Sequence, residues 1–394
     1  MIKMTSDSMI AGAREPLTTR LDGRCRGTPM NENVRASGRA SALAARLRNI
    51  SIVACLVLPV IVHAAPPPSG GVPTGTVYYE TSGSNSPANS MKPDGSAKTV
   101  LNVLSGAPSY QLHGGKRWFL RRMDVAGDPY YFGPVRRDLF ALREDGALAV
   151  RLTDDPGLEY TNLEQPNMTW APDEDASRAT VSALGRRHYA DGSIVAGSGG
   201  LYTATLRFDG AGNVLGLDAP LALLVSIGLN GNPANEMPDA DTYTWSPGMT
   251  EVVADHRNSS PSAPASPGEL RIVNVTTGLA RSLLNDTSRV LSYPAWSRDG
   301  SRIAFVSNAV SEDRVESIAV NGTGRKTLVR TTSAYEGYGA PWWSPDSAYL
   351  VYEFFWRKPS DALYQADVYR ITAAGAGKTN LTADIPWASP VGWR

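Results

Sequence analysis

Side chains that could support catalysis or bind a metal ion are few in this sequence. Three histidines follow residue 65: His113, His188 and His256. His188 and His256 could form a divalent-metal site with carboxylates such as Asp239 or Asp241, although no spacing requires it. The sequence contains no Gly-x-Ser-x-Gly elbow and no Gly-x-x-x-x-Gly-Lys phosphate loop. We therefore expect no catalytic residues and no cofactor.

Two acidic segments and two cysteines add little chemistry. Asp154-Asp155 and Asp173-Glu174-Asp175 carry the oxygen ligands that calcium prefers, in a pattern that is also common in surface loops. Cys25 and Cys55 both precede an expected signal-peptide cleavage site, so the mature chain would have neither a thiol nor a disulfide. Calcium or another divalent metal is therefore possible but not indicated.

A repeat is the strongest pattern in the sequence, and it determines which elements position any site. Each copy has a short strand ending in an aromatic residue, a Ser-Pro-Asp-Gly-type turn and a returning apolar strand. The aromatic position falls at Tyr110, Trp170, Trp245, Trp296 and Trp343, with spacings of 60, 75, 51 and 47 residues. The shortest spacings approach the roughly 40–50 residues of a four-stranded propeller blade. We expect these aromatic residues, together with Trp393, to pack between blades.

A second pattern completes each unit and indicates how the ring closes. It consists of a strand, a glycine-containing turn and another strand, as in Leu139–Gly146 and Val368–Gly375. The segment 76–101 matches this second pattern but lacks a first strand, whereas Ser389–Arg394 matches a first strand and has nothing after it. We therefore predict an all-β, six-bladed propeller of four-stranded antiparallel blades, spanning residues 74–394. The C-terminal strand would pair into the N-terminal blade and close the ring.

The repeat resembles that of the TolB-like, WD-type propeller family. The Trp-Ser-Pro-Asp-Gly turn carries the resemblance, as do the strand ends Arg151-Leu-Thr153 and Asn380-Leu-Thr382. It covers about residues 75–394 and does not include the small N-terminal domain of TolB. The resemblance implies the fold, but the motif is structural and is shared by proteins of many functions.

The N-terminal segment has the pattern of an export signal. Arginines 35, 39, 46 and 48 precede the apolar run 50–62, and small residues follow at Ala64 and Ala65. We expect residues 1–65 to be a signal peptide cleaved near Ala64/Ala65, with translation starting at Met1 or Met30, and residues 66–73 to be a Pro/Gly-rich linker. The mature chain would be periplasmic or secreted, with no membrane span. It would carry 29 basic and 34 acidic residues, which gives no reason to expect nucleic-acid binding.

Connection lengths predict that one end of the propeller carries the binding function. The first-to-second and third-to-fourth turns of each meander are short, whereas the second-to-third connections and the links between blades are long and varied. We count 124–137, 185–200, 217–243, 256–269, 330–340 and 355–366 among these long segments. The candidate binding residues in them are Tyr130, Tyr131, Arg136, Arg137, His188, Tyr189, Tyr335, Tyr338, Trp356, Arg357 and Trp387.

Two functions remain open from the sequence. In the first, the propeller is a monomeric scaffold that binds a protein or another ligand of the cell envelope, because Tyr, Trp and Arg are common interface anchors. In the second, it is a metal-dependent lyase or hydrolase acting on polysaccharide at the mouth of the channel. The identity of the partner or ligand does not follow from the sequence.

Overall fold

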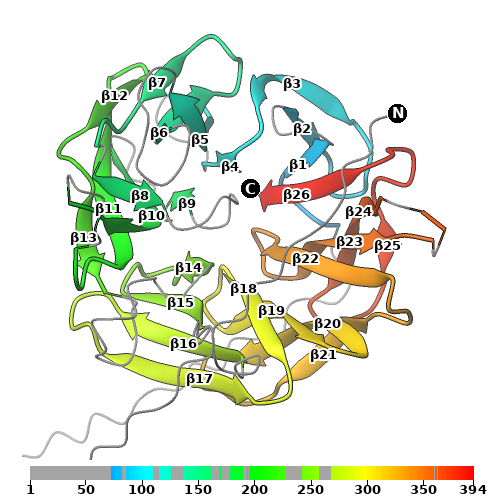
Figure 1. Cartoon of the computed structure of the whole chain (residues 1–394). Helices are drawn as coiled ribbons and strands as arrows, with labels where there is room; N and C mark the ends of the chain where they lie inside the picture. The colour runs from blue at the N-terminus through cyan, green and yellow to red at the C-terminus, as the bar shows by residue number, and fades with distance from the viewer. Residues whose placement is uncertain are drawn as a thin grey trace, which may run out of the picture. The chain divides into compact units, whose positions relative to one another are not determined.

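β-Strands joined by turns make up the part of the chain that the computed structural model describes. That part comprises residues 72–81, 86–109, 115–125, 136–155, 157–160, 168–170, 178–189, 193, 195–226, 242–256, 268–358, 360–361 and 363–394. All of it belongs to the second of two units of the chain, Met1–Ile61 and Val62–Arg394. Among these residues there is no helix long and apolar enough to cross a membrane. The strands form six antiparallel sheets around a ring, which confirms the predicted six-bladed propeller (Figure 1).

Four blades are formed by four consecutive strands each, numbered from the inside of the ring outwards. Blade two contains β4 (Ala107–Pro108), β5 (Trp118–Val125), β6 (Arg136–Arg143) and β7 (Ala149–Arg151). Blade four contains β14 (Tyr243–Trp245), β15 (Glu251–His256), β16 (Gly268–Asn274) and β17 (Ala280–Asp286). Blade five contains β18 (Val290–Trp296), β19 (Arg302–Ala309), β20 (Glu312–Ala319) and β21 (Lys326–Arg330). Blade six contains β22 (Glu336–Trp343), β23 (Tyr349–Trp356), β24 (Gln365–Thr372) and β25 (Thr379–Asn380).

Blade one closes the ring with strands from both ends of the propeller. Its order is β26 (Ala388–Trp393), β1 (Val77–Thr81), β2 (Pro87–Met91) and β3 (Thr99–Leu104). β26 and β1 are antiparallel with Val77 opposite Trp393, and the backbones of Thr76 and Arg394 exchange hydrogen bonds of 2.6 and 3.0 Å. The C-terminal strand is therefore the innermost strand of the N-terminal blade, as predicted.

Blade three is less regular than the repeat suggests. Two short strands, β8 (Leu158–Tyr160) and β9 (Met168–Trp170), share the innermost position beside β10 (Arg178–Arg187). Two others, β12 (Val214–Leu217) and β13 (Ala222–Val225), share the outermost position beside β11 (Gly200–Phe208). Pro220 lies between β12 and β13, and its lack of a backbone N–H is consistent with the break in the ladder.

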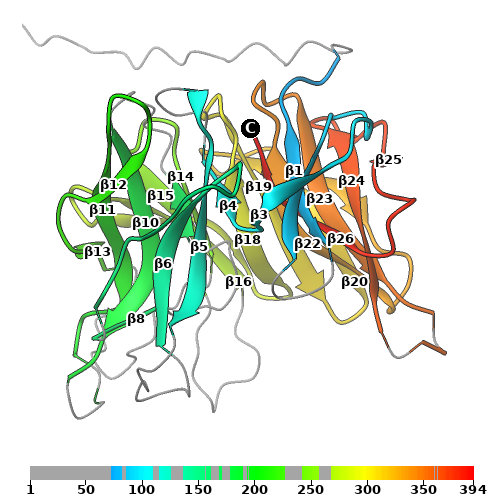
Figure 2. The same ribbon diagram turned by 90° about the horizontal axis from the view of Figure 1, so that it is seen from above.

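The strands run between two ends of the propeller (Figure 2). The short-turn end carries the first-to-second and third-to-fourth turns, and the long-connection end carries the second-to-third connections and the links between blades. At the short-turn end of blade five, the Ser297 hydroxyl donates to Asp299 at 2.6 Å, and Gly300 supplies the left-handed backbone (φ 74°) of the turn. At the long-connection end of the same blade, only Val310 and Ser311 separate β19 from β20.

The tryptophans of the repeat lie in the hydrophobic core. Trp245, Trp296, Trp343 and Trp393 are buried in four different clusters. Trp343 Nε1 donates to the carbonyl of Ala295 in blade five at 2.9 Å, so this side chain links two blades. Tyr110 and the side chain of Trp170 lie outside the described residues.

The Leu-Thr strand ends have a hydrogen-bonding role at the long-connection end. Thr153 Oγ1 accepts from the Leu139 N–H at 2.9 Å and donates to the buried Asp138 carboxylate at 3.2 Å. In blade six, Thr382 Oγ1 accepts from the Val368 N–H at 2.9 Å and donates to Asp367 at 3.3 Å. Each threonine thereby fixes the exit of the outermost strand against the start of the third strand.

Candidate binding site

The predicted binding residues of blades two and three are only partly described. Tyr130, Tyr131 and the side chains of Arg136 and Arg137 lie outside the described residues, although Arg136 and Arg137 begin β6 at the long-connection end. His188 is buried, and its backbone N–H donates to the Gly157 carbonyl at 2.8 Å. The side chain of Tyr189, 57% exposed, is available to a partner.

Tyr338 is a correction to the sequence prediction. The segment 330–340 is expected to be a connection, but β22 already begins at Glu336, and the Tyr338 side chain is only 2% exposed. Its ring lies 5.6 Å from the rings of Tyr352 and Phe354, and burial raises the pKa of its hydroxyl. Tyr338 therefore belongs to the core between blades five and six and offers no surface to a partner.

Tyr335, Arg357 and Tyr364 meet at the long-connection end of blade six. The guanidinium carbon of Arg357 lies over the Tyr335 ring at 5.4 Å from its centre and over the Tyr364 ring at 5.1 Å. These distances are those of cation–π contacts. The two tyrosines are 37% and 44% exposed, and neighbouring Leu363 is 77% exposed. We call Tyr335, Arg357, Leu363 and Tyr364 the blade-six cluster.

Strands and a tight turn hold the blade-six cluster in place. The backbone N–H of Arg357 donates to the Tyr335 carbonyl at 3.0 Å. This bond joins the segment that follows β23 to the segment that precedes β22. The Asp361 N–H donates to the Lys358 carbonyl at 2.9 Å and closes a turn. Phe355 meets Tyr364 edge to face at 5.6 Å, so a half-buried residue near the end of β23 supports the exposed ring.

Trp356 and Trp387 lie at the same end of blade six. Trp356 ends β23 opposite Glu336 and Gln365, and Trp387 makes a parallel bridge with Ala366 at the start of β24. Both side chains are half-buried. The structure therefore brings Tyr335 and Arg357 into contact and places Trp356 and Trp387 near them, whereas Tyr189 belongs to blade three.

Sequence reasoning missed Tyr364 and Leu363. Both lie inside the predicted connection 355–366, where they form an apolar pair among polar and small residues. That pair is the signal that could have identified them, because a large apolar side chain in an exposed connection is typical of an interface.

Arg357 has no carboxylate partner among the described residues. Its hydrogen bonds to other described residues go to backbone carbonyls, and the one from its guanidinium group is a bond of 3.3 Å from Nη1 to the Asp361 carbonyl. Its Nε atom is buried without a hydrogen-bond partner in the same part of the chain. Glu336, which follows Tyr335 in the chain, is engaged elsewhere, because it accepts a hydrogen bond from the Thr332 backbone N–H at 2.7 Å.

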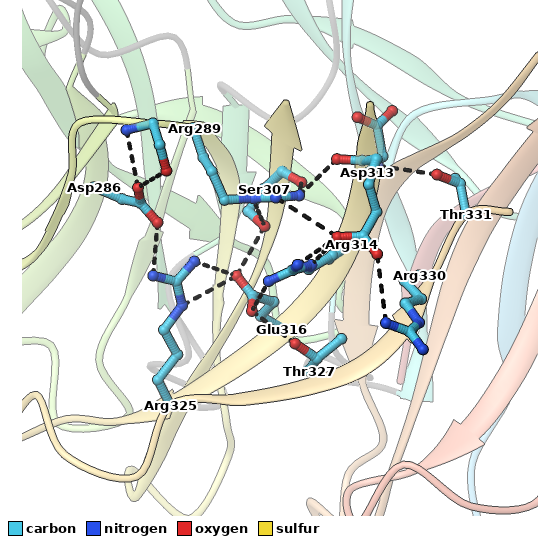
Figure 3. Close-up of polar contacts among 12 residues, drawn as sticks. Asp286, Arg289, Ser307, Asp313, Arg314, Glu316, Arg325, Thr327, Arg330 and Thr331 are labelled. Atoms are coloured by element: carbon cyan, nitrogen blue, oxygen red, sulfur yellow. Dashed lines mark hydrogen bonds and ion pairs between the residues drawn. The ribbon is translucent and has the colours of Figure 1, made fainter. Parts of the chain in front are cut away.

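Blade five carries the opposite arrangement, in which arginines and carboxylates neutralise one another (Figure 3). Glu316, 2% exposed, accepts from Arg325 at 2.5 Å, from the Ser307 hydroxyl at 2.8 Å and from Thr327 at 2.9 Å. Arg325 also contacts Asp286 at 2.7 Å. Glu312 is the carboxylate partner of the remaining arginines of this network: Arg289, Arg314 and Arg330. We call this set the blade-five network.

The residues of the alternative metal site are only partly described. His256 is buried, with Nε2 3.9 Å from Glu269; burial and the nearby Arg271 lower its pKa, against the opposing effect of Glu269. Within the described ranges, no three His, Cys, Asp or Glu side chains are grouped to hold a metal ion. Asp239 and Asp241 lie outside these ranges, so elemental analysis of the purified protein is the measurement that decides the metal-dependent alternative.

Comparison with known proteins found solved structures that are similar at low sequence identity. No protein-family model and no curated protein matches the sequence. Similar solved structures include TolB from Acinetobacter baumannii, with 14% identity and a TM-score of 0.49, covering 82% of this chain and 67% of that one. A putative TolB from Agrobacterium tumefaciens has 13% identity and a TM-score of 0.45, with coverages of 81% and 99%. An oligogalacturonate lyase in complex with manganese has 16% identity and a TM-score of 0.43, with coverages of 79% and 73%. These likenesses assign no activity to this chain.

Proposed function

We propose that the protein is an exported, monomeric scaffold that binds a protein partner of the cell envelope through the long-connection end of blade six. The observation that carries the proposal is the blade-six cluster, in which Arg357 lies over two exposed tyrosines without a carboxylate partner in the described part of the chain. Arginine and tyrosine are enriched among the few residues that dominate binding energy at interfaces.

The rigidity of the cluster supports the proposal. Tyr335 and Arg357 are joined through their backbones, and Phe355 supports Tyr364 from within β23. Side chains that are ordered before binding lose less conformational entropy when the partner arrives. A rigid strand end is therefore a better base for an interface than a long connection alone.

The sequence supports the location. A basic segment, an apolar run of thirteen residues from Ile50 to Val62 and small residues at Ala64 and Ala65 have the order of an export signal. Detection of the mature chain in the periplasmic or secreted fraction, with a mass that corresponds to cleavage near Ala65, tests this part of the proposal.

Site-specific photo-crosslinking tests the binding surface. A photoreactive amino acid at Leu363 places the probe in the blade-six cluster, and the same amino acid at Ala374 is the matched control, because Ala374 is exposed at the short-turn end of the same blade. We expect one dominant adduct from position 363 in envelope preparations and none from position 374. Equal adducts from both positions, or none from either, would show that this end is not the binding surface.

A further inference from the structure

We propose that the partner binds the blade-six cluster with a peptide segment that presents a carboxylate beside an apolar side chain. This inference rests on the proposed function and specifies the chemistry of the partner at the same site. It is carried by the polar atoms that the cluster leaves unused and by the apolar surface that surrounds them.

Arg357 supplies the charge to be matched. The two tyrosine rings lie against the guanidinium group, and its N–H bonds lie in the plane of the group. Because Nε is buried, the terminal nitrogens are the donors left for a partner. A carboxylate can accept two such N–H bonds at once, which is the geometry that arginine recognises best. The described residues supply only a long bond to the Asp361 carbonyl. The adjacent Lys358 is exposed and makes no ion pair with any described residue, so it adds a second positive charge.

Two acidic residues next to the cluster in the chain, Glu336 and Asp361, form hydrogen bonds within the fold, and Glu336 accepts from Thr332. The Asp361 carboxylate accepts from its neighbour Ser360 at 3.2 Å. The carboxylate that Arg357 lacks is therefore expected from another molecule.

The apolar surface favours a peptide over an acidic oligosaccharide. Sugar rings stack on the open faces of aromatic side chains, but here Arg357 covers a face of each tyrosine ring and Phe355 packs against Tyr364. What remains exposed is most of Leu363 and part of each of the two tyrosines, whose side chains end in a hydroxyl group. These groups suit an apolar side chain and the polar backbone of a peptide.

Selection from random peptides displayed on phage, followed by synthesis of the enriched peptides, tests the inference. Each peptide is prepared with its Asp or Glu and with the corresponding Asn or Gln, and the dissociation constants are measured by fluorescence anisotropy. Removing the carboxylate should weaken binding to the wild-type protein about tenfold or more. In R357Q, the acid and amide peptides should bind with similar dissociation constants, because the bond between the carboxylate and Arg357 is already absent. In R357K, the loss of affinity on removing the carboxylate should lie between those of the wild type and R357Q.

R281Q is the matched control, since Arg281 is an exposed arginine at the short-turn end, and it should bind as the wild type does. The melting temperature of each variant reports whether it is folded, and Y364L provides a second test of the site if R357Q is not. Peptides that compete with crosslinking at position 363 but bind equally well as amides would overturn the carboxylate inference and leave the proposed function intact. Failure of every peptide, or Arg357-dependent binding of an acidic oligosaccharide instead, would overturn the choice of a peptide.

Discussion

Blades five and six both carry arginines, but the arginines of the blade-five network are paired with carboxylates whereas Arg357 of blade six is not. In the blade-five network, Arg289, Arg314, Arg325 and Arg330 each have a carboxylate within 4 Å, and Glu316 is buried among hydroxyl and guanidinium donors. In the blade-six cluster, Arg357 lies over two tyrosines and has no carboxylate in the described part of the chain. Removing one partner of a matched buried charge leaves the other uncompensated and destabilises the fold, whereas an unmatched charge on an exposed aromatic surface is available to a binding partner.

The largest expected effect is the unfolding of the whole ring, which would abolish the blade-five network and the blade-six cluster together. Both belong to one closed ring, and deletion of 389–394 removes β26, whose Val391 and Trp393 are buried. The loss of several buried side chains should lower the free energy of unfolding by on the order of 5 kcal/mol or more. Thermal unfolding followed by circular dichroism measures this. Removal of residues 66–73 is the control and should leave the melting temperature unchanged; a similar melting temperature for the two truncations would disprove ring closure by the C-terminal strand.

The next largest effect concerns the blade-five network alone. E316Q removes the buried charge of the blade-five network and should lower the free energy of unfolding by about 2–3 kcal/mol, since Arg325 keeps its contact with Asp286. Urea unfolding measures the change. E251Q is the control, because the Glu251 side chain bonds no other described residue, and its expected effect is below about 0.5 kcal/mol. Equal destabilisation by the two variants would mean that the network adds nothing specific.

The pH dependence of the same variant sharpens the contrast. Burial acts to raise the pKa of Glu316, but the hydrogen bonds from Arg325 and Ser307 outweigh it and bring the pKa below its ordinary value of 4.5. A carboxyl with a lowered folded-state pKa contributes stability that is fully present above about pH 4.5 and lost as the pH falls through the lower folded-state value. The stability difference between wild type and E316Q should therefore shrink below pH 4.5. A difference that stays constant down to pH 2.5 would contradict the assigned shift.

The smallest of these effects concerns the support of the blade-six cluster. A β-carbon on Gly337 would lie 2.2 Å from two ring atoms of Phe355, so G337A must displace this ring and with it the edge contact to Tyr364. We expect a loss of about 1–2 kcal/mol in stability and a several-fold weaker crosslink from position 363. G210A is the control, because a β-carbon there meets no atom within 4 Å. Unchanged crosslinking in G337A would show that Phe355 does not position the cluster.

Much of the fold could be predicted because the same pattern of strands and turns recurs in successive blades. The recurrence of tryptophan before a Ser-Pro turn identified the innermost strands, and the isolated Trp393 identified the strand that closes the ring. The Leu-Thr strand ends were equally informative, since their threonines hydrogen-bond Asp138 and Asp367.

The error at Tyr338 has a physical cause. Gly337 and Gly339 made this segment look like a connection, because glycine weakens an isolated strand. In the structure both glycines lie within β22 at close approaches: a β-carbon on Gly339 would lie 2.1 Å from Glu353 Oε2, and one on Gly337 would meet Phe355. Such a contact joins residues from different strands and leaves no periodic signal. The pairing of Arg357 with Tyr335 and Tyr364 could not be predicted for the same reason, although the residue types indicated binding.

The central claim is that Arg357 serves binding whereas Glu316 serves stability. Crosslinking from position 363 and the urea midpoint, both measured on wild type, R357Q and E316Q under identical conditions, test it most directly. We predict that R357Q loses most of the crosslinked product while its stability falls by only about 1 kcal/mol, the size of two exposed cation–π contacts. E316Q should keep the product and lose more stability. Undiminished crosslinking in R357Q, or crosslinking that falls in proportion to stability in both variants, would contradict the claim.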